Sequence, residues 1–97
     1  MKIPEYLDWL REQPDQISYT PPRNDPHHCG RFGTAKRNHD EVCVSLNRVN
    51  HQLAEDNKID RDMLIQKAQH QFNCWLETLS IEKKLKILQD LANENKM

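Results

Sequence analysis

Proline and glycine between residues 14 and 33 constrain the fold of this chain more than any other feature. Four of its five prolines and both of its glycines lie in that stretch. Proline lacks a backbone donor and disfavours helix in the residue before it, so the stretch cannot be a continuous helix. We predict a shaped loop region there, with one short strand over Ile17-Ser18-Tyr19-Thr20.

A short amphipathic helix is predicted before this loop, over residues 4–12. Pro4 suits the first turn of a helix, and apolar residues follow it at helical spacing. Gln13-Pro14 then ends the helix, because the residue before a proline avoids helical geometry.

A second helix is predicted after Asp40. Apolar residues spaced four, three and four apart give it one hydrophobic face, namely Val42, Leu46, Val49 and Leu53. Strand character over residues 41–44 competes with the first turn of this helix.

The C-terminal part of the chain reads as a helical hairpin over residues 56–97. Asp60 is a candidate N-cap for a third helix and Ser80 for a fourth. The apolar face of the third helix comprises Leu64, Ala68, Phe72, Trp75 and Leu79, and that of the fourth comprises Ile81, Leu85, Leu88 and Ala92. Because 97 residues bury only one modest core, we predict a single mainly α domain with a small irregular or β region.

Charge is distributed unevenly along the chain although its sum is only −1. The local charge is −2 over residues 1–22, +2 over residues 23–48 and −1 over residues 49–97. The near-neutral sum gives no general attraction to nucleic acid, but the middle segment combines positive charge with three of the five histidines.

Neither a secretory signal nor a membrane span is apparent in the sequence. Charge appears within the first five residues, and no apolar stretch approaches the roughly 20 residues that cross a bilayer. Cys29, Cys43 and Cys74 are an odd number at wide spacing, which is a poor disulfide framework. We therefore expect a cytoplasmic protein with reduced, mostly buried thiols.

The segment from Asp25 to His51 carries the residues most suited to chemistry. His27, His28, Asp40 and His51 have the side chains needed to bind one divalent cation beside a general base. Basic residues nearby would neutralise phosphates. The alternative is that His27 and His28 make loop hydrogen bonds while His51 and His70 lie on polar helix faces.

Several short motifs in residues 6–55 resemble a family of small phage and prophage nucleases of the HNH type. The motifs are Tyr6-Leu7-Asp8-Trp9-Leu10, Asp25-Pro26-His27-His28, Gly33-Thr34-Ala35-Lys36, Asp40 and Ser45-Leu46-Asn47-Arg48-Val49-Asn50-His51. The resemblance implies a ββα-metal site in which His28 is the base, His27 and His51 are metal ligands, and Asp40 orients the base. The expected ion is Mg²⁺, Mn²⁺ or Ni²⁺.

The chain departs from this family at its structural zinc site. The family places two cysteines before the Asp-Pro-His-His loop and a Cys-x-x-His pair at the start of the closing helix. This chain has no cysteine over residues 13–19, and the pair has become Asn47 and Asn50. No structural zinc is expected, so the loop lacks the metal that in the family fixes it against the helix.

Two functions follow from the sequence. The whole chain resembles the small anti-RecBCD modulators of lambdoid phages, which implies binding to the RecC side of the host RecBCD helicase-nuclease and protection of phage DNA ends. The same resemblance implies a host prolyl isomerase as an extra partner. Candidate docking residues are Phe72, Trp75, Pro21 and Pro22, although both aromatic residues can equally fill the core.

The other function is a metal-dependent HNH endonuclease acting on phage recombination intermediates. The sequence favours the docking function by a small margin, because zinc loss and near-neutral charge both weaken a free-standing nuclease.

Overall fold

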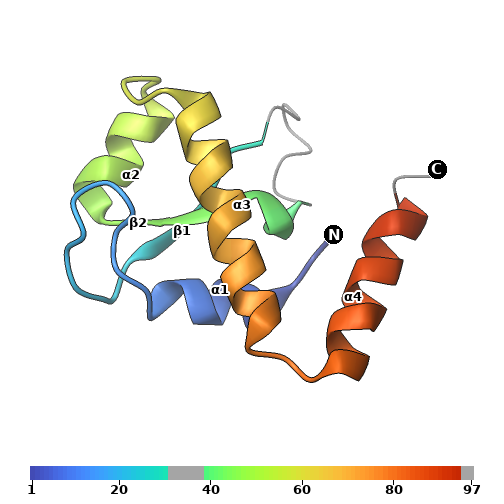
Figure 1. The fold of residues 1–97 in the computed structure, drawn as a ribbon. Coiled ribbons are helices and arrows are strands. Elements are labelled where there is room, and N and C mark those ends of the chain that lie inside the picture. Colours follow the sequence, from blue (N-terminus) through green and yellow to red (C-terminus); the bar gives the residue numbers. More distant parts are fainter. Residues whose placement is uncertain (31–38, 95–97) are drawn as a thin grey trace.

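The computed structural model describes residues 1–30 and 39–94 (Figure 1). This part of the chain contains four α-helices, one 3-10 turn and a two-stranded antiparallel sheet, which confirms a mainly α fold with a small β region. The elements in chain order are α1 (Pro4–Arg11), β1 (Asp25–His28), η2 (Asp40–Val42), β2 (Cys43–Leu46), α2 (Arg48–Glu55), α3 (Arg61–Glu77) and α4 (Ile81–Glu94). None of these described helices is both long and apolar enough to cross a membrane.

The first strand lies later in the loop region than the sequence predicted. Residues 25–28 form β1, whereas the predicted strand over residues 17–20 is wrong. The carboxylate of Asp15 accepts hydrogen bonds from the backbone N–H groups of Ile17 and Ser18. Those donors close a turn and cannot join a strand ladder, and Tyr19 follows with a left-handed φ of 57°.

The second predicted helix is shorter than expected and its predicted apolar face is wrong. Residues 43–46 form the buried strand β2, which pairs with β1 so that Asp25 lies opposite Leu46 and His28 opposite Cys43. The side chain of Asn47 accepts a hydrogen bond from the backbone N–H of Asn50 and caps α2 there. Two residues of the predicted face are consequently exposed, namely Val49 at 70% and Leu53 at 38%.

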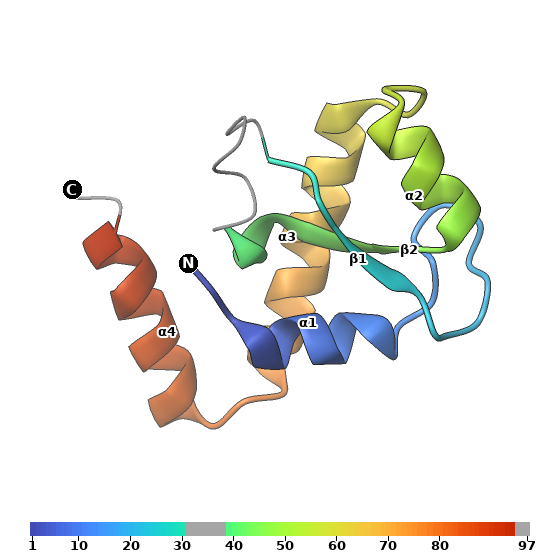
Figure 2. The ribbon, with the colours of Figure 1, turned by 180° about the vertical axis from the view of Figure 1, so that it is seen from behind.

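The core lies between α1, β2 and α3, and α3 crosses both α1 and β2 in Figure 2. Tyr6 of α1 makes an edge contact with Phe72 of α3 at a ring-centroid distance of 5.2 Å. Phe72 and Trp75 are buried at 8% and 3% exposure. They fill the core, the alternative that the sequence left open, and do not offer an exposed surface to a partner.

The C-terminal helices begin where their predicted caps lie. The side chain of Asp60 caps α3, and the hydroxyl of Ser80 accepts a hydrogen bond from the backbone N–H of Lys83 in α4. The apolar face predicted for α4 is nevertheless wrong, because its buried residue is Ile87 while Ile81, Leu85 and Leu88 are exposed. Ile87 joins the core cluster and Leu91 packs against it, while Lys83 and Lys84 form exposed ion pairs with Glu5 and Glu77.

Gln71 joins three elements of the core by hydrogen bonds. Its side-chain oxygen accepts from the backbone N–H of Ser45 at 2.8 Å, and its amide nitrogen donates to the Ser45 hydroxyl at 3.2 Å. That hydroxyl in turn donates to the carbonyl of Leu10 at 2.7 Å. The Gln71 side chain thereby forms hydrogen bonds with polar groups of β2 that have no partner within the sheet.

Replacing Gln71 with leucine is expected to lower the free energy of unfolding by about 1–3 kcal/mol, because the buried N–H of Ser45 loses its acceptor. Urea denaturation followed by circular dichroism measures the change. Gln69→Leu, at an exposed position on the same helix, is the control. Equal shifts of the two midpoints would contradict this role for Gln71.

Candidate functional site

The candidate site lies where the end of β1 meets α2 and η2. His27 and His28 are the last two residues of β1, so their side chains point to opposite faces of the strand. His27 lies against His51 of α2, with a ring-centroid distance of 5.0 Å. His28 lies against Asp40 of η2. The four predicted residues are thus brought together as two pairs.

The first pair, with Glu55, forms a candidate metal centre. One ligand atom each from His27, His51 and Glu55 lie within 4.8 Å of one another. A Glu55 carboxylate oxygen is 3.4 Å from His27 Nδ1 and 3.4 Å from His51 Nε2. Metal–ligand bonds of ~2.1 Å in a tetrahedron place two ligands ~3.4 Å apart, which matches both distances from Glu55.

Glu55 is a residue that the sequence reasoning missed. It lies four residues after His51 on α2, and positions i and i+4 share one face of a helix. That spacing was the available signal. Asp25 supports the centre from β1, since its carboxylate lies 3.4 Å from His51 Nδ1 and can orient the imidazole ring.

The second pair has the geometry of a base and its positioning group. His28 Nε2 lies 2.9 Å from a carboxylate oxygen of Asp40, whose side chain is buried. The other carboxylate oxygen accepts the backbone N–H of Ile3 at 2.5 Å, and the Asp40 backbone N–H donates to the Met1 carbonyl at 2.9 Å. An ionised carboxylate only accepts hydrogen bonds, so His28 Nε2 carries the proton and Nδ1 can accept one.

Cys43 lies beside this pair and completes a second group of candidate metal ligands. One ligand atom each from His28, Asp40 and Cys43 lie within 4.8 Å of one another. Burial raises the pKa of the Cys43 thiol, and the nearby Asp40 carboxylate raises it further. Because metals bind the thiolate, an ion at this group would have to displace the thiol proton of Cys43. Cys29 is also buried and Cys74 is exposed, and none of the three cysteines is in a disulfide.

A polar network joins the loop after α1 to the start of α2. Asn50 donates from its side-chain amide to both carboxylate oxygens of Asp15, at 3.1 and 3.2 Å, and to the Ser18 hydroxyl at 2.9 Å. The Asn47 backbone N–H donates to Asp15 at 2.7 Å. The network therefore joins residues 15–18 to the start of α2, the two segments that the zinc of the resembling family joins.

This network controls the ionisation of Asp15, which is fully buried. Burial by itself raises the pKa of Asp15. Hydrogen bonds from the backbone of Ser18 and Asn47, the side chain of Asn50 and the backbone of Ile17 outweigh that effect, so the pKa lies below its ordinary value of 3.8. The carboxylate is accordingly charged in the folded chain at neutral pH.

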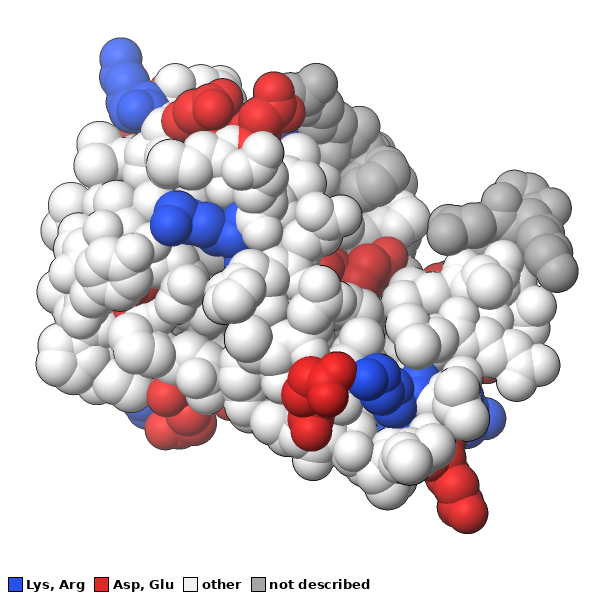
Figure 3. Space-filling view, viewed as in Figure 1, with Lys and Arg blue, Asp and Glu red and all other residues white. Residues whose placement is uncertain are grey.

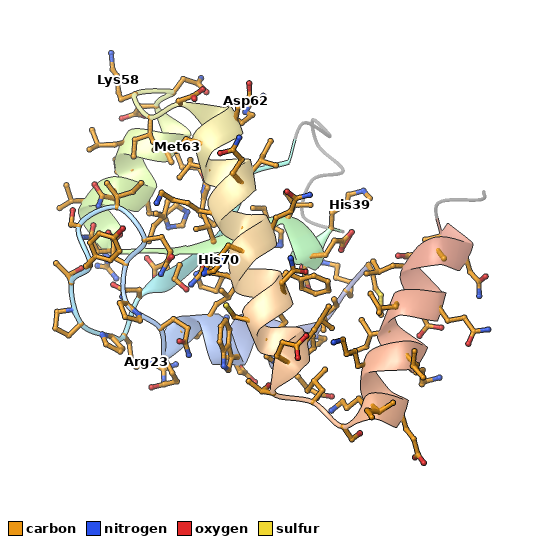
Figure 4. All side chains as sticks on the ribbon, in the orientation of Figure 1. Arg23, His39, Lys58, Asp62, Met63 and His70 are labelled. Atoms are coloured by element: carbon orange, nitrogen blue, oxygen red, sulfur yellow. The ribbon has the colours of Figure 1, made fainter. Side chains whose placement is uncertain are left out.

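Other predicted residues fall outside this centre. The segment Gly33-Thr34-Ala35-Lys36, with the basic residues Arg31 and Arg37, lies outside the described part of the chain. Pro21 and Pro22 are exposed in the loop after α1. His70 lies on the exposed side of α3 (Figure 4), which agrees with the alternative that it occupies a polar helix face.

Comparison of this chain with protein-family models, curated proteins and solved structures gives no match. The resemblance to HNH-type nucleases therefore rests on the motifs and stays a prediction.

Proposed function

We propose that the chain is a divalent-metal-dependent phosphodiesterase of the HNH type that cleaves nucleic acid, the alternative that the sequence placed second. One observation carries the proposal. The three-ligand group of His27, His51 and Glu55 and the His28–Asp40 pair meet at one pocket, which is lined by His27, His28 and Glu55. A metal centre and a general base beside one another are what hydrolysis of a phosphodiester requires.

Each residue of this group has a defined task. His28 takes the proton of the attacking water at Nδ1, and Asp40 holds the ring by accepting from Nε2. His27, His51 and Glu55 would hold the ion, which when bound stabilises negative charge on the phosphate and the leaving oxygen. Two imidazoles and one carboxylate suit Mn²⁺, Ni²⁺ or Zn²⁺ better than Mg²⁺, which prefers oxygen ligands.

The charges on the face shown in Figure 3 favour only weak binding to nucleic acid. Lysine and arginine are interspersed with aspartate and glutamate on the face in Figure 3. Affinity for a polyanion depends on the number of phosphates neutralised, so this face offers little non-specific binding to a duplex. A nuclease of this kind selects its substrate at the site itself.

A second candidate function is docking on the host RecBCD complex through RecC. The observation that favours it is the exposed apolar stripe of α4, where Ile81 is 76%, Leu85 60% and Leu88 40% exposed. Such a stripe is suited to packing against another protein. Pro21 and Pro22 are exposed and accessible to a prolyl isomerase, which we retain as a proposed extra partner.

Metal binding tests the first function directly. Calorimetric titration with Mn²⁺, Ni²⁺ and Zn²⁺ is expected to show one site, weakened by about 10–100-fold or more in His51→Gln and Glu55→Gln because each variant loses a ligand. His70→Gln removes a histidine outside the site and is the control. Equal loss in all three variants would contradict a built centre.

Function is tested with the same protein on linear and branched DNA. Cleavage that needs the ion and is lost in His51→Gln supports the nuclease. Stable capture of RecBCD without cleavage in any metal would instead support docking, and Leu85→Lys should then abolish the capture.

A further inference from the structure

Two hollows flank the candidate metal centre and share one wall. A pocket of about 200 Å³ is lined on one side by His27, His28 and Glu55. A shallower hollow of about 380 Å³ on the other side is lined by Asp25, His51 and Glu55. Since Glu55 lines both, the three candidate ligands stand between the hollows.

Each hollow also contains one arginine at the start of a helix. Arg61, the first residue of α3, lines the pocket beside His28. Arg48, the first residue of α2, lines the hollow beside His51. The turn between α2 and α3, marked by Lys58 in Figure 4, brings Arg61 to the site from a segment outside the resemblance to nucleases.

Arg48 and Arg61 differ from the other described arginines in their ion pairs. Arg11 pairs with Asp8 and Arg23 with Glu12, whereas Arg48 and Arg61 have no ion pair among residues 1–30 and 39–94. A cation in the first turn of a helix is also disfavoured by the helix dipole. Neither guanidinium group is paired with a carboxylate of the described residues, so both can bind an anion.

We propose that Arg48 and Arg61 bind the phosphates on the two sides of the scissile phosphate, so that a nucleic-acid strand crosses the metal centre from one hollow to the other. The inference rests on the proposed function and names its substrate class, an internal phosphodiester of a polynucleotide strand. Guanidinium groups bind phosphate through two parallel hydrogen bonds, which fixes position as well as charge. These two contacts hold the strand on either side of the metal centre.

Two substrates that both contain a phosphodiester bond test the strand path separately from the proposed function. Bis(4-nitrophenyl) phosphate is a diester without flanking phosphates, and a single-stranded DNA oligonucleotide has them. For Arg48→Gln and Arg61→Gln, the ratio of kcat/KM on the oligonucleotide to that on the small diester is expected to fall about 10-fold, mainly through KM. Arg11→Gln removes the same charge on α1 and should keep the ratio.

Binding measured without turnover gives a second test of the two arginine contacts. In a His28→Ala background with Mn²⁺, the Kd for a labelled oligonucleotide should rise about 10-fold with either substitution, and the slope of log Kd against log salt should fall by about 1 for each lost phosphate contact. Hydrolysis of both substrates with unchanged ratio and slope would overturn the strand path alone. No hydrolysis of either substrate by the unaltered chain would overturn the proposed function and the strand path with it.

Discussion

Replacing His28 with alanine is expected to lower kcat for metal-dependent cleavage of DNA by about 10²–10⁴-fold, because the attacking water loses its general base. His28 is placed for this task by a 2.9 Å contact between its Nε2 and Asp40, which leaves Nδ1 as the acceptor. Metal affinity should change little, since His28 is not one of the three candidate ligands. Cleavage of a labelled oligonucleotide under single-turnover conditions measures the rate.

Asp40→Asn tests whether the positioning group acts through His28. Its amide can present a donor to Nε2 and favour the wrong tautomer, so the rate should fall while KM stays constant, and the pH profile should change shape. His70→Ala, at an exposed position on α3, is the control and should cleave at the unaltered rate. Cleavage by His28→Ala at the unaltered rate would place the base at another residue.

Replacing Asp15 with alanine is expected to lower the free energy of unfolding by at least about 3 kcal/mol, since several donors lose a charged acceptor in a buried position. For a chain of this size that corresponds to a fall in Tm of about 12–24 °C. Thermal and urea denaturation measure both values. Asp8→Ala breaks an exposed ion pair with Arg11 and should cost less than about 1 kcal/mol.

The same carboxylate predicts how stability depends on acid. The folded pKa of Asp15 lies below the ordinary value of 3.8, so its stabilisation is present above that value and is lost as the pH falls through the folded pKa. Asp15→Asn should lack this part of the acid dependence. If its stability falls with acid as steeply as that of the unaltered chain, another carboxylate is responsible.

Local sequence signals predicted the helices that have their own caps and stops. Pro4 and Gln13-Pro14 delimit α1, and Asp60 and Ser80 precede α3 and α4, because capping and proline effects act within a few residues. The four residues of the candidate site were likewise named from their types and order along the chain.

Contacts between distant segments decided the rest. Residues 16–18 form a turn because the Asp15 carboxylate accepts the backbone N–H groups of Ile17 and Ser18. Residues 43–46 form a strand because β1 pairs with them. Leu85 of α4 is exposed because the helix packs against the core through Ile87 and Leu91, which lie on another face. Periodicity describes one helix alone and contains no information about which face a neighbour covers.

The candidate site was also determined partly by the sequence and partly by the tertiary structure. The sequence by itself determined which side chains could do chemistry, namely His27, His28, Asp40 and His51. Only the tertiary structure decided that they form two pairs, that Glu55 joins the first, and that Asp15 and Asn50 connect the loop to α2 where cysteines are absent. The physical reason is that residue type fixes what an atom can bind, whereas distance between atoms is set by packing across the whole chain.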